Sequence, residues 1–123
     1  MKYFTKITGW GEDALGFLEE EDMNFLVIFN NTAPDELAEI SVLHEPAELK
    51  ADPAPGDTLM IGGKAFDVTA VGAEAIHTLR TLGHCTLSFQ GGTEPERPGC
   101  IMLEGEEPLR KEDITVGSSI ELY

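Results

Sequence analysis

The apolar stretches of this chain are short, and turn-forming residues interrupt them at close intervals. The clearest case is Thr58–Ile61 followed by Lys64–Val71, two strand-like runs joined by Gly62-Gly63, a dipeptide typical of two-residue β-hairpins. The segment Ala51–Asp57 that precedes them carries two prolines and a glycine, which indicates a tight loop. Strand pairs joined by tight turns favour an all-β fold, mostly an antiparallel barrel or sandwich of short strands, with one or two short helices.

Eight segments have the alternation or apolar content expected of strands. They are Phe4–Trp10, Asn24–Phe29, Ile40–His44, Thr58–Ile61, Lys64–Val71, His84–Gln90, Cys100–Leu103 and Ser118–Leu122. The second of these is apolar on both faces, which indicates a central strand or one that a partner subunit covers. A homodimer is therefore one way in which this strand could be shielded from water.

The best helix of the chain is expected over Ala73–Leu82, and Gly83 supplies its stop. Three apolar residues at threefold spacing predict its buried stripe: Ile76, Leu79 and Leu82. A shorter helix is expected over Asp35–Glu39, with Asn31 or Thr32 as its cap. Both helices are short, which agrees with a fold built mainly of strands.

Length and charge narrow the function classes. The 123 residues fit a single domain, 1–123, that can bury a core without crosslinks. The chain has 23 acidic and 8 basic side chains, a net charge of −15, which repels nucleic acid and anionic lipid but attracts a basic protein partner. No apolar run is long enough to span a bilayer, and the N-terminus lacks a secretory signal, so we expect a cytoplasmic protein without direct membrane insertion.

The two cysteines, Cys85 and Cys100, are too few for a disulfide framework and too far apart for a redox or zinc pair. Cys85 alternates with Leu87 and Phe89, which predicts a reduced, buried thiol. A disulfide would require their two strands to be neighbours. The residues that alternate with this inward set are expected to face outward: His84, Thr86 and Ser88.

His44 ends the alternating run Ile40–His44, and Glu45-Pro46 stops that run directly afterwards. Residues two apart on a strand share a face, so His44 should lie in line with Ile40 and Val42, at the mouth of an apolar surface beside a loop. A neutral, accessible imidazole there can act as a nucleophile or a ligand. The alternative, which spacing alone favours, is a histidine at the rim of the core that hydrogen-bonds to a backbone carbonyl.

A family resemblance strengthens the first interpretation. Several strings together resemble the glucitol/sorbitol-specific IIA component of the bacterial phosphotransferase system: Val68-Thr69-Ala70-Val71-Gly72, Leu82-Gly83-His84, Thr86-Leu87-Ser88-Phe89 and Arg97-Pro98-Gly99. Val42-Leu43-His44, followed by Glu48-Leu49-Lys50, is similar to the segment that carries the family's phosphorylated histidine. Ala47 stands where the family commonly has glycine, and Glu45-Pro46 also departs from the pattern. The resemblance covers nearly the whole chain.

The resemblance implies a phosphotransferase component that works without a cofactor or metal in sugar-alcohol uptake. His44 would accept a phosphoryl group, on Nε2, from a phosphohistidine of the basic carrier HPr and pass it to a cysteine of the IIB component, which acts with the membrane component IIC. His84 is the candidate supporting residue, and Thr86 and Ser88 are further candidates to meet the phosphoryl oxygens. His77 is expected to be exposed on its helix.

Two other classes of function remain open from the residues. One is a metal- or small-ligand-binding β-barrel without catalysis, in which His44, His84 and Cys85 would have to converge. The other is a regulatory interaction module whose acidic surface binds a partner and which carries no chemistry of its own.

Overall fold

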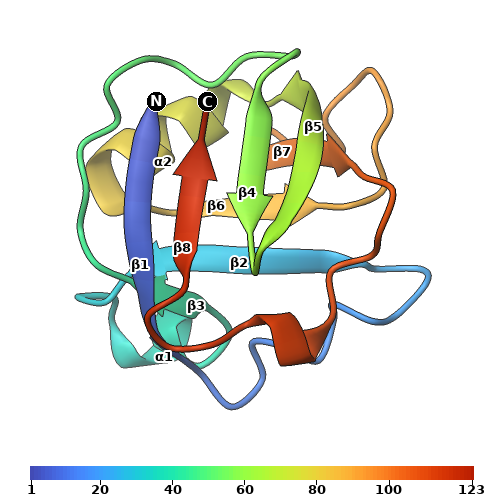
Figure 1. Cartoon of the computed structure of the whole chain (residues 1–123). Coiled ribbons are helices and arrows are strands. Elements are labelled where there is room, and N and C mark those ends of the chain that lie inside the picture. The colour runs from blue at the N-terminus through green and yellow to red at the C-terminus, as the bar shows by residue number, and fades with distance from the viewer.

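A computed structural model describes residues 1–123 and shows a closed barrel of eight strands (Figure 1). The strands are β1 (Tyr3–Trp10), β2 (Phe25–Asn30), β3 (Val42–His44), β4 (Thr58–Ile61), β5 (Lys64–Val71), β6 (Cys85–Ser88), β7 (Cys100–Glu104) and β8 (Ser119–Leu122). Their order around the barrel is β1-β3-β2-β6-β7-β5-β4-β8, and β8 pairs with β1 to close the ring. The predicted fold class, an all-β barrel with few short helices, is confirmed.

Two strand pairs, β2–β3 and β6–β7, are parallel, whereas the other pairs are antiparallel. The β4–β5 hairpin turns at Gly62-Gly63, both with positive φ, as predicted. A parallel pair cannot be closed by such a turn, so β2 and β3 are joined by a longer connection that contains the short helix α1 (Asp35–Ala38). The parallel register sets Asn30 directly beside His44.

Alternate residues of each strand point into the barrel, because successive side chains of a strand face opposite sides. In β1, Tyr3, Thr5 and Ile7 are buried while the residues between them are exposed. Tyr3 and Ile7 belong to a cluster of 22 buried apolar side chains that fills the barrel. On the outer face of β2, two aromatic residues of the chain itself provide cover: Phe17 stacks on Phe25 at 4.9 Å between ring centroids, and His84 lies against Phe29 at 4.6 Å.

The helix α2 (Ala73–Leu82) has the predicted bounds, and its contacts with β6 and β7 hold it against the barrel (Figure 1). Its buried residues are Ala75 and Leu79, and Ile76 is half-buried. The prediction that Leu82 completes the buried stripe is wrong, because this side chain is 44% exposed. The helix ends at Gly83 in a left-handed turn, and Leu82 lies on the outer side of that last turn.

Two predictions around α1 also need correction. The residue that caps α1 is Pro34, and no side chain makes a capping hydrogen bond, so neither Asn31 nor Thr32 is the cap. The strand β3 begins at Val42, not at Ile40, which lies in a turn and is 38% exposed. The backbone N–H of Ile40 donates to the Leu37 carbonyl at 3.3 Å. Ile40 therefore belongs to the turn that follows α1, although the alternation of apolar residues predicted it in the strand.

Both cysteines are free and buried. The strands β6 and β7 are neighbours, but Cys85 points into the barrel, whereas Cys100 packs with Ala70 and Met102 in a separate small cluster. Burial raises the pKa of the Cys85 thiol to about 12, with a smaller contribution from Cys100. The predicted reduced, buried thiol is confirmed.

Candidate functional site

His44 is the last residue of β3, and its side chain is fully buried, with 0% exposure. Its Nδ1 lies 2.8 Å from the carbonyl oxygen of Glu45, and its Nε2 lies 2.7 Å from the carbonyl oxygen of Gly83. The expectation of an accessible imidazole at an apolar rim is therefore wrong. The alternation with Val42 is correct, but it carries the ring into the barrel, where the end of α2 covers it.

The two carbonyl contacts limit the protonation states that satisfy the ring. A carbonyl oxygen only accepts, so each contact requires a hydrogen on the ring nitrogen that faces it. A neutral imidazole carries one N–H and can satisfy only one of the two carbonyls, whereas a ring with both protons satisfies both. For Nε2 to present a lone pair to a reaction partner, the Gly83 carbonyl must leave its present position.

The wall on the Nε2 side is the C-terminal turn of α2. Gly83 has φ +64°, and its N–H donates to the Leu79 carbonyl at 3.1 Å, while the His84 N–H donates to the Thr78 carbonyl at 3.2 Å. This left-handed ending is the helix stop that glycine favours. The carbonyl end of a helix carries partial negative charge, so the Nε2 side of the ring faces hydrogen-bond acceptors and no donor of this turn.

The wall on the Nδ1 side is the segment that follows β3. The Glu45 carbonyl accepts hydrogen bonds from His44 and from the Thr5 hydroxyl, while the Glu45 side chain is exposed. Farther along, buried Leu49 joins the core cluster. The Glu45 carboxylate thus points away from the ring, as expected for the residue next to an inward strand residue.

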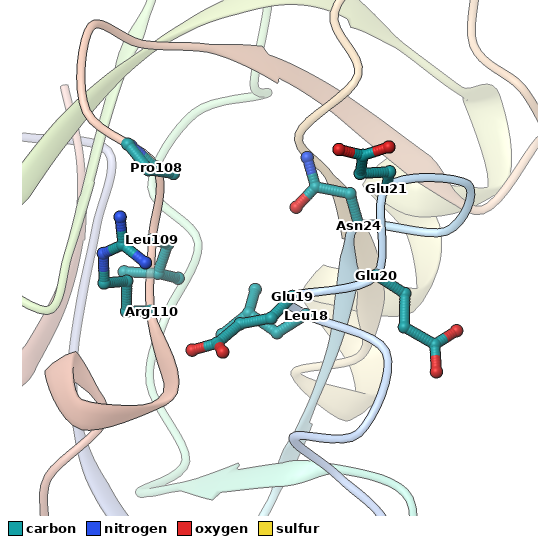
Figure 2. Close-up of a pocket in the computed structure, with 8 residues that line it drawn as sticks. All are labelled: Leu18, Glu19, Glu20, Glu21, Asn24, Pro108, Leu109 and Arg110. Atoms are coloured by element: carbon teal, nitrogen blue, oxygen red, sulfur yellow. The ribbon is translucent and has the colours of Figure 1, made fainter.

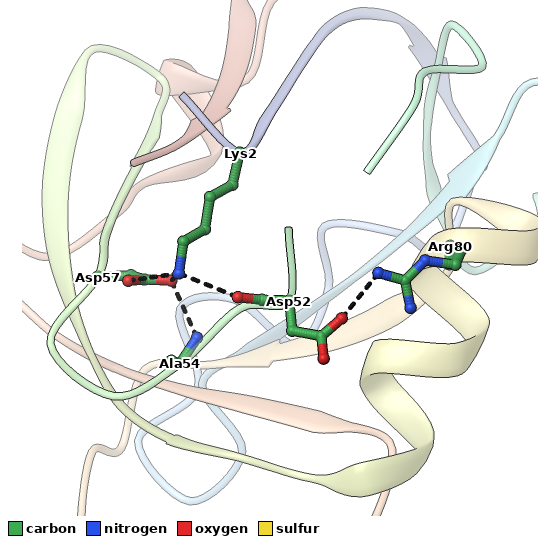
Figure 3. Close-up of polar contacts among 5 residues, drawn as sticks. All are labelled: Lys2, Asp52, Ala54, Asp57 and Arg80. Carbon is green, nitrogen blue, oxygen red and sulfur yellow. Dashed lines mark hydrogen bonds and ion pairs between the residues drawn. The ribbon is translucent and has the colours of Figure 1, made fainter. Parts of the chain in front are cut away.

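The same connecting segment is attached to α2 by an ion-pair network (Figure 3). The Asp52 carboxylate accepts from Arg80 of α2 at 2.7 Å, and its backbone carbonyl accepts from Lys2 Nζ at 3.0 Å. Lys2 also pairs with Asp57 at 2.8 Å, and Asp57 in turn accepts the Ala54 N–H at 2.9 Å. The N-terminus, the segment after His44 and the helix that covers His44 are therefore connected to one another.

Two buried polar atoms near His44 have no hydrogen-bond partner: the Tyr3 hydroxyl and Asn30 Oδ1. The Tyr3 ring meets the His44 ring edge-on, with centroids 6.1 Å apart, and burial raises the pKa of its hydroxyl to about 12. The sequence prediction missed both residues. Alternation along β2 would have placed Asn30 inward with Leu26 and Ile28, but only the parallel pairing with β3 brings it beside His44.

The ring of His84 does not contact His44. The contact is made by Gly83, the residue before His84 in the chain. Gly83 contributes the carbonyl that faces His44, while the His84 ring packs on Phe29 and its Nδ1 lies 3.1 Å from the Ile28 carbonyl. That carbonyl can only accept, so the hydrogen is on Nδ1 and a neutral His84 keeps its lone pair on Nε2. His77 is exposed on α2, as predicted.

Thr86 and Ser88 are not brought to His44. They line a cavity of about 240 Å³ on the outer face of the barrel together with Phe25, Val27, Glu96, Arg97 and Cys100. Ser88 faces outward, as predicted, but it is buried there, and its hydroxyl donates to the Glu96 carboxylate at 2.8 Å. His44 points into the barrel interior, so the Thr86 and Ser88 hydroxyls lie on the other face of the sheet from the His44 ring.

A second cleft, of about 200 Å³, lies between the acidic segment before β2 and the segment before the 3₁₀ turn η1 (Lys111–Asp113). Figure 2 shows Glu19 reaching toward the Arg110 side of this cleft, with Asn24 and Glu21 above it. Asn24 precedes β2, whereas Asn30 ends it, so this cleft and His44 lie at opposite ends of the same strand.

The convergence that the metal-binding alternative requires is not observed, because His44 faces two carbonyls and the His84 ring lies on the outer face of β2. No group of three or more His, Cys, Asp or Glu side chains is placed to hold a metal ion. None of the helices is long and apolar enough to cross a bilayer.

Comparisons with known proteins agree with this architecture. Residues 2–121 match the family model of the PTS system glucitol/sorbitol-specific IIA component. The chain is 39% identical over 116 residues to the PTS system glucitol/sorbitol-specific EIIA component of Escherichia coli (strain K12), which covers 94% of this chain and 89% of that protein. It has the same identity and coverage with the Shigella flexneri protein of the same description.

A solved structure has the same fold. The crystal structure of a PTS system IIA component from Enterococcus faecalis V583 superposes with a TM-score of 0.78 at 27% identity, covering 96% of this chain and 97% of the other. The fold and these likenesses place the protein among the IIA components of the phosphotransferase system. Within that class, the chain belongs to the glucitol/sorbitol-specific IIA component family.

Proposed function

We propose that this protein, with residues 1–123 acting as one domain, is a phosphoryl carrier in sugar-alcohol uptake. His44 accepts a phosphoryl group from the phosphohistidine of HPr and passes it to a cysteine of the IIB component, which works with the membrane component IIC. Membership of the glucitol/sorbitol IIA family carries this proposal. The held orientation of the His44 ring, in which one nitrogen bonds to a fixed carbonyl, supports it.

Phosphoryl transfer to His44 requires one tautomer of its ring and a movement of the last turn of α2. With its hydrogen on Nδ1, His44 donates to the Glu45 carbonyl, and the lone pair is on Nε2. The Gly83 carbonyl occupies the position opposite Nε2, so the last turn of α2 must shift before an in-line transfer can occur. Closure of this turn also keeps water away from the ring when no partner is bound.

The acidic surface fits a basic phosphoryl donor. Glu45 and Glu48 are exposed in the segment after His44, and α1 adds Asp35 and Glu36 on the connection before it. No carboxylate contacts the His44 ring, whose two partners are backbone carbonyls. These charges can attract HPr electrostatically without placing a negative group against the transferred phosphoryl group.

His84 is proposed as a supporting residue in this scheme. Its ring is held by Phe29 and the Ile28 carbonyl, directly after the glycine whose carbonyl covers His44. A shift of the Gly83 carbonyl necessarily moves the backbone of His84. The contacts of the His84 ring therefore influence how the last turn of α2 moves away from His44. We expect replacement of His84 to slow phosphoryl transfer, while His44 remains able to accept the group.

Phosphorylation by the purified general components tests the proposal. The protein is incubated with enzyme I, HPr and phosphoenolpyruvate, and the labelled residue is identified by mass spectrometry under non-acidic conditions. We expect an acid-labile, base-stable label on His44 that is absent in His44→Ala and retained in His77→Ala, the matched exposed histidine. A label that persists in His44→Ala would reject His44 as the acceptor.

A regulatory interaction module is the second candidate, because His44 is fully buried and both of its nitrogens face carbonyls. In that case the ring is a core residue, and the acidic surface alone binds the partner. The same incubation separates the two functions, since a module without chemistry takes up no label under conditions in which HPr itself is phosphorylated.

A further inference from the structure

We infer that the side-chain amide of Asn30 binds the phosphoryl group carried by His44. This inference rests on the proposed function and adds to it a group that contacts the transferred phosphoryl oxygens. It replaces the expectation that Thr86 or Ser88 serves this purpose, since both face the outside of the barrel.

The backbone places Asn30 and His44 side by side. They are direct partners in the parallel register of β2 and β3, so their side chains leave the sheet on the same face. The connection after β2 fixes this arrangement further, because the Asn31 N–H donates to the His44 carbonyl at 2.7 Å and the Ala33 N–H donates to the Asn30 carbonyl at 3.0 Å. The strand β3 cannot slide along β2 without breaking the bond between Asn31 and His44.

The two side chains converge on Gly83, the residue whose carbonyl faces Nε2. A Cβ atom added to Gly83 would overlap Asn30 Oδ1 and would lie 2.7 Å from His44 Cε1. The Asn30 amide, the His44 ring and the Gly83 backbone are thus packed against one another. When the Gly83 carbonyl moves aside, the space opposite Nε2 opens next to the amide.

The Asn30 amide is incompletely satisfied in the closed arrangement. Its Oδ1 is buried without a hydrogen-bond partner, which is uncommon because an unsatisfied buried acceptor is costly. An asparagine amide presents either its oxygen or its two N–H donors by rotating about its last bond. A phosphoryl group on Nε2 would accept these N–H donors, and a hydrogen bond to a charged acceptor is stronger than one between neutral groups.

The surroundings leave few other donors for such a group. The end of α2 presents carbonyl oxygens, which repel a phosphoryl group, and the Nδ1 hydrogen of His44 is directed at Glu45. In the transfer, the Nε2 lone pair forms the new P–N bond while the P–N bond of the donor phosphohistidine breaks. The electron pair of the broken bond stays on the donor ring nitrogen, and the amide supplies no proton.

The test compares Asn30→Asp with Asn31→Asp. Both variants add one negative charge at adjacent positions, but only residue 30 is beside His44, whereas the side chain of Asn31 is exposed. The loss of one donor to a transferring group typically slows a reaction by roughly 100-fold or more. We therefore expect Asn30→Asp to slow the labelling of His44 by HPr at least tenfold and to shorten the lifetime of the phosphohistidine, with Asn31→Asp within about twofold of the parent.

A second test uses NMR of the parent protein, so it does not depend on whether a variant folds. The chain has three asparagines and one glutamine, so its side-chain amide spectrum in ¹⁵N NMR is simple. Phosphorylation should shift the Asn30 amide resonances and leave those of Asn24 and Asn31 nearly unchanged. Equal labelling rates in the two variants, or an unshifted Asn30 amide in the phosphorylated protein, would overturn the inference.

A small chemical donor, phosphoramidate, separates this inference from the proposed function. If His44 is labelled by phosphoramidate but not by HPr, the carrier function fails, and the Asn30 comparison is made with the chemical donor. If His44 is labelled by neither donor, both the function and the inference are rejected.

Discussion

The ring of His44 is held between two carbonyl groups, and this explains why a single residue next to it, Gly83, is so constrained. Gly83 has φ +64°, a conformation that costs a residue with a side chain about 1–2 kcal/mol. It also has no room for a Cβ, because Asn30 and His44 fill the space. The residue that covers the histidine is therefore required to be glycine for two independent reasons.

Gly83→Ala should destabilise the protein more than Gly63→Ala does. Gly63 also has positive φ, +77°, but nothing lies within 4 Å of its added Cβ. In the Gly63 variant, the free energy of unfolding should fall by about 1–2 kcal/mol, the conformational cost alone. In the Gly83 variant it should fall by this amount and by the additional cost of steric overlap. Urea unfolding of both variants measures the difference. Equal losses would show that the contact with Asn30 and His44 relaxes freely.

The Cys85 thiol predicts a loss of stability at alkaline pH. Burial raises its pKa to about 12 from 9.0, so the folded state holds this proton more tightly than the unfolded state. The stabilising contribution is complete below pH 9 and is lost as the pH rises towards 12. At about 1.4 kcal/mol per pH unit, the free energy of unfolding should fall by about 2 kcal/mol between about pH 8 and about pH 10.5.

Urea unfolding of the parent and of Cys85→Ala over this pH range checks the prediction. The variant will have a different stability at neutral pH because it leaves a cavity. Only the slope against pH is compared, and it should be shallower without the thiol. Identical slopes would assign the alkaline loss to other groups, such as Tyr3, whose pKa is also raised to about 12.

The α2 helix and the segment after β3 form a cover over the histidine, and the Asp52–Arg80 pair joins them. Both side chains are largely exposed, so the pair should contribute less than about 1 kcal/mol to global stability. Its effect should be local. Asp52→Asn removes the charge but keeps the backbone carbonyl that binds Lys2.

We expect Asp52→Asn to speed the exchange of the Gly83 and His84 amide hydrogens, which close the last turn of α2, while the amides of β2 are unaffected. Asp67→Asn is the matched control, because Asp67 is exposed on β5 and takes part in none of the ion pairs. Native-state hydrogen exchange by NMR makes the comparison. Unchanged exchange at Gly83 would show that the ion pair does not hold the cover closed.

The sequence was sufficient for features that depend on neighbouring residues. The Gly62-Gly63 hairpin, the bounds of α2 and its glycine stop follow from local turn and helix chemistry. The parallel pairing of β2 with β3 depends on contacts across the barrel, and alternation cannot reveal it. For the same reason, the shared face of His44 and Val42 was predicted correctly, whereas the predicted accessibility of the ring is wrong, and its burial under Gly83 beside Asn30 does not follow from alternation.

The charge of the whole molecule should govern its encounter with a basic phosphoryl donor. Raising the ionic strength from about 0.01 M to about 1 M shortens the Debye length from about 30 Å to about 3 Å, so the rate of labelling by HPr should fall at least about tenfold. Carboxylates close to His44 should affect the rate of labelling more than carboxylates far from it. Glu45→Gln/Glu48→Gln, after His44, should slow labelling more than Glu19→Gln/Glu20→Gln, at the other end of β2.

Stopped-flow or quenched-flow labelling at several salt concentrations measures these rates. The two double variants carry the same net charge, so equal rates would mean that overall charge, and not its placement near the histidine, steers the donor. A rate that does not depend on salt would exclude electrostatic steering altogether.

The pairing of β1 with β8 brings the first and last strands together, and the Lys2 N–H donates to the Leu122 carbonyl at 2.7 Å (Figure 1). A short linker could therefore join these two strands, and the chain could be reopened in the exposed loop between β6 and β7 without removing any strand. Such a circular permutant would keep every barrel contact while reversing the order in which the segments before and after this loop leave the ribosome, because native pairing depends on proximity in space and not on chain order.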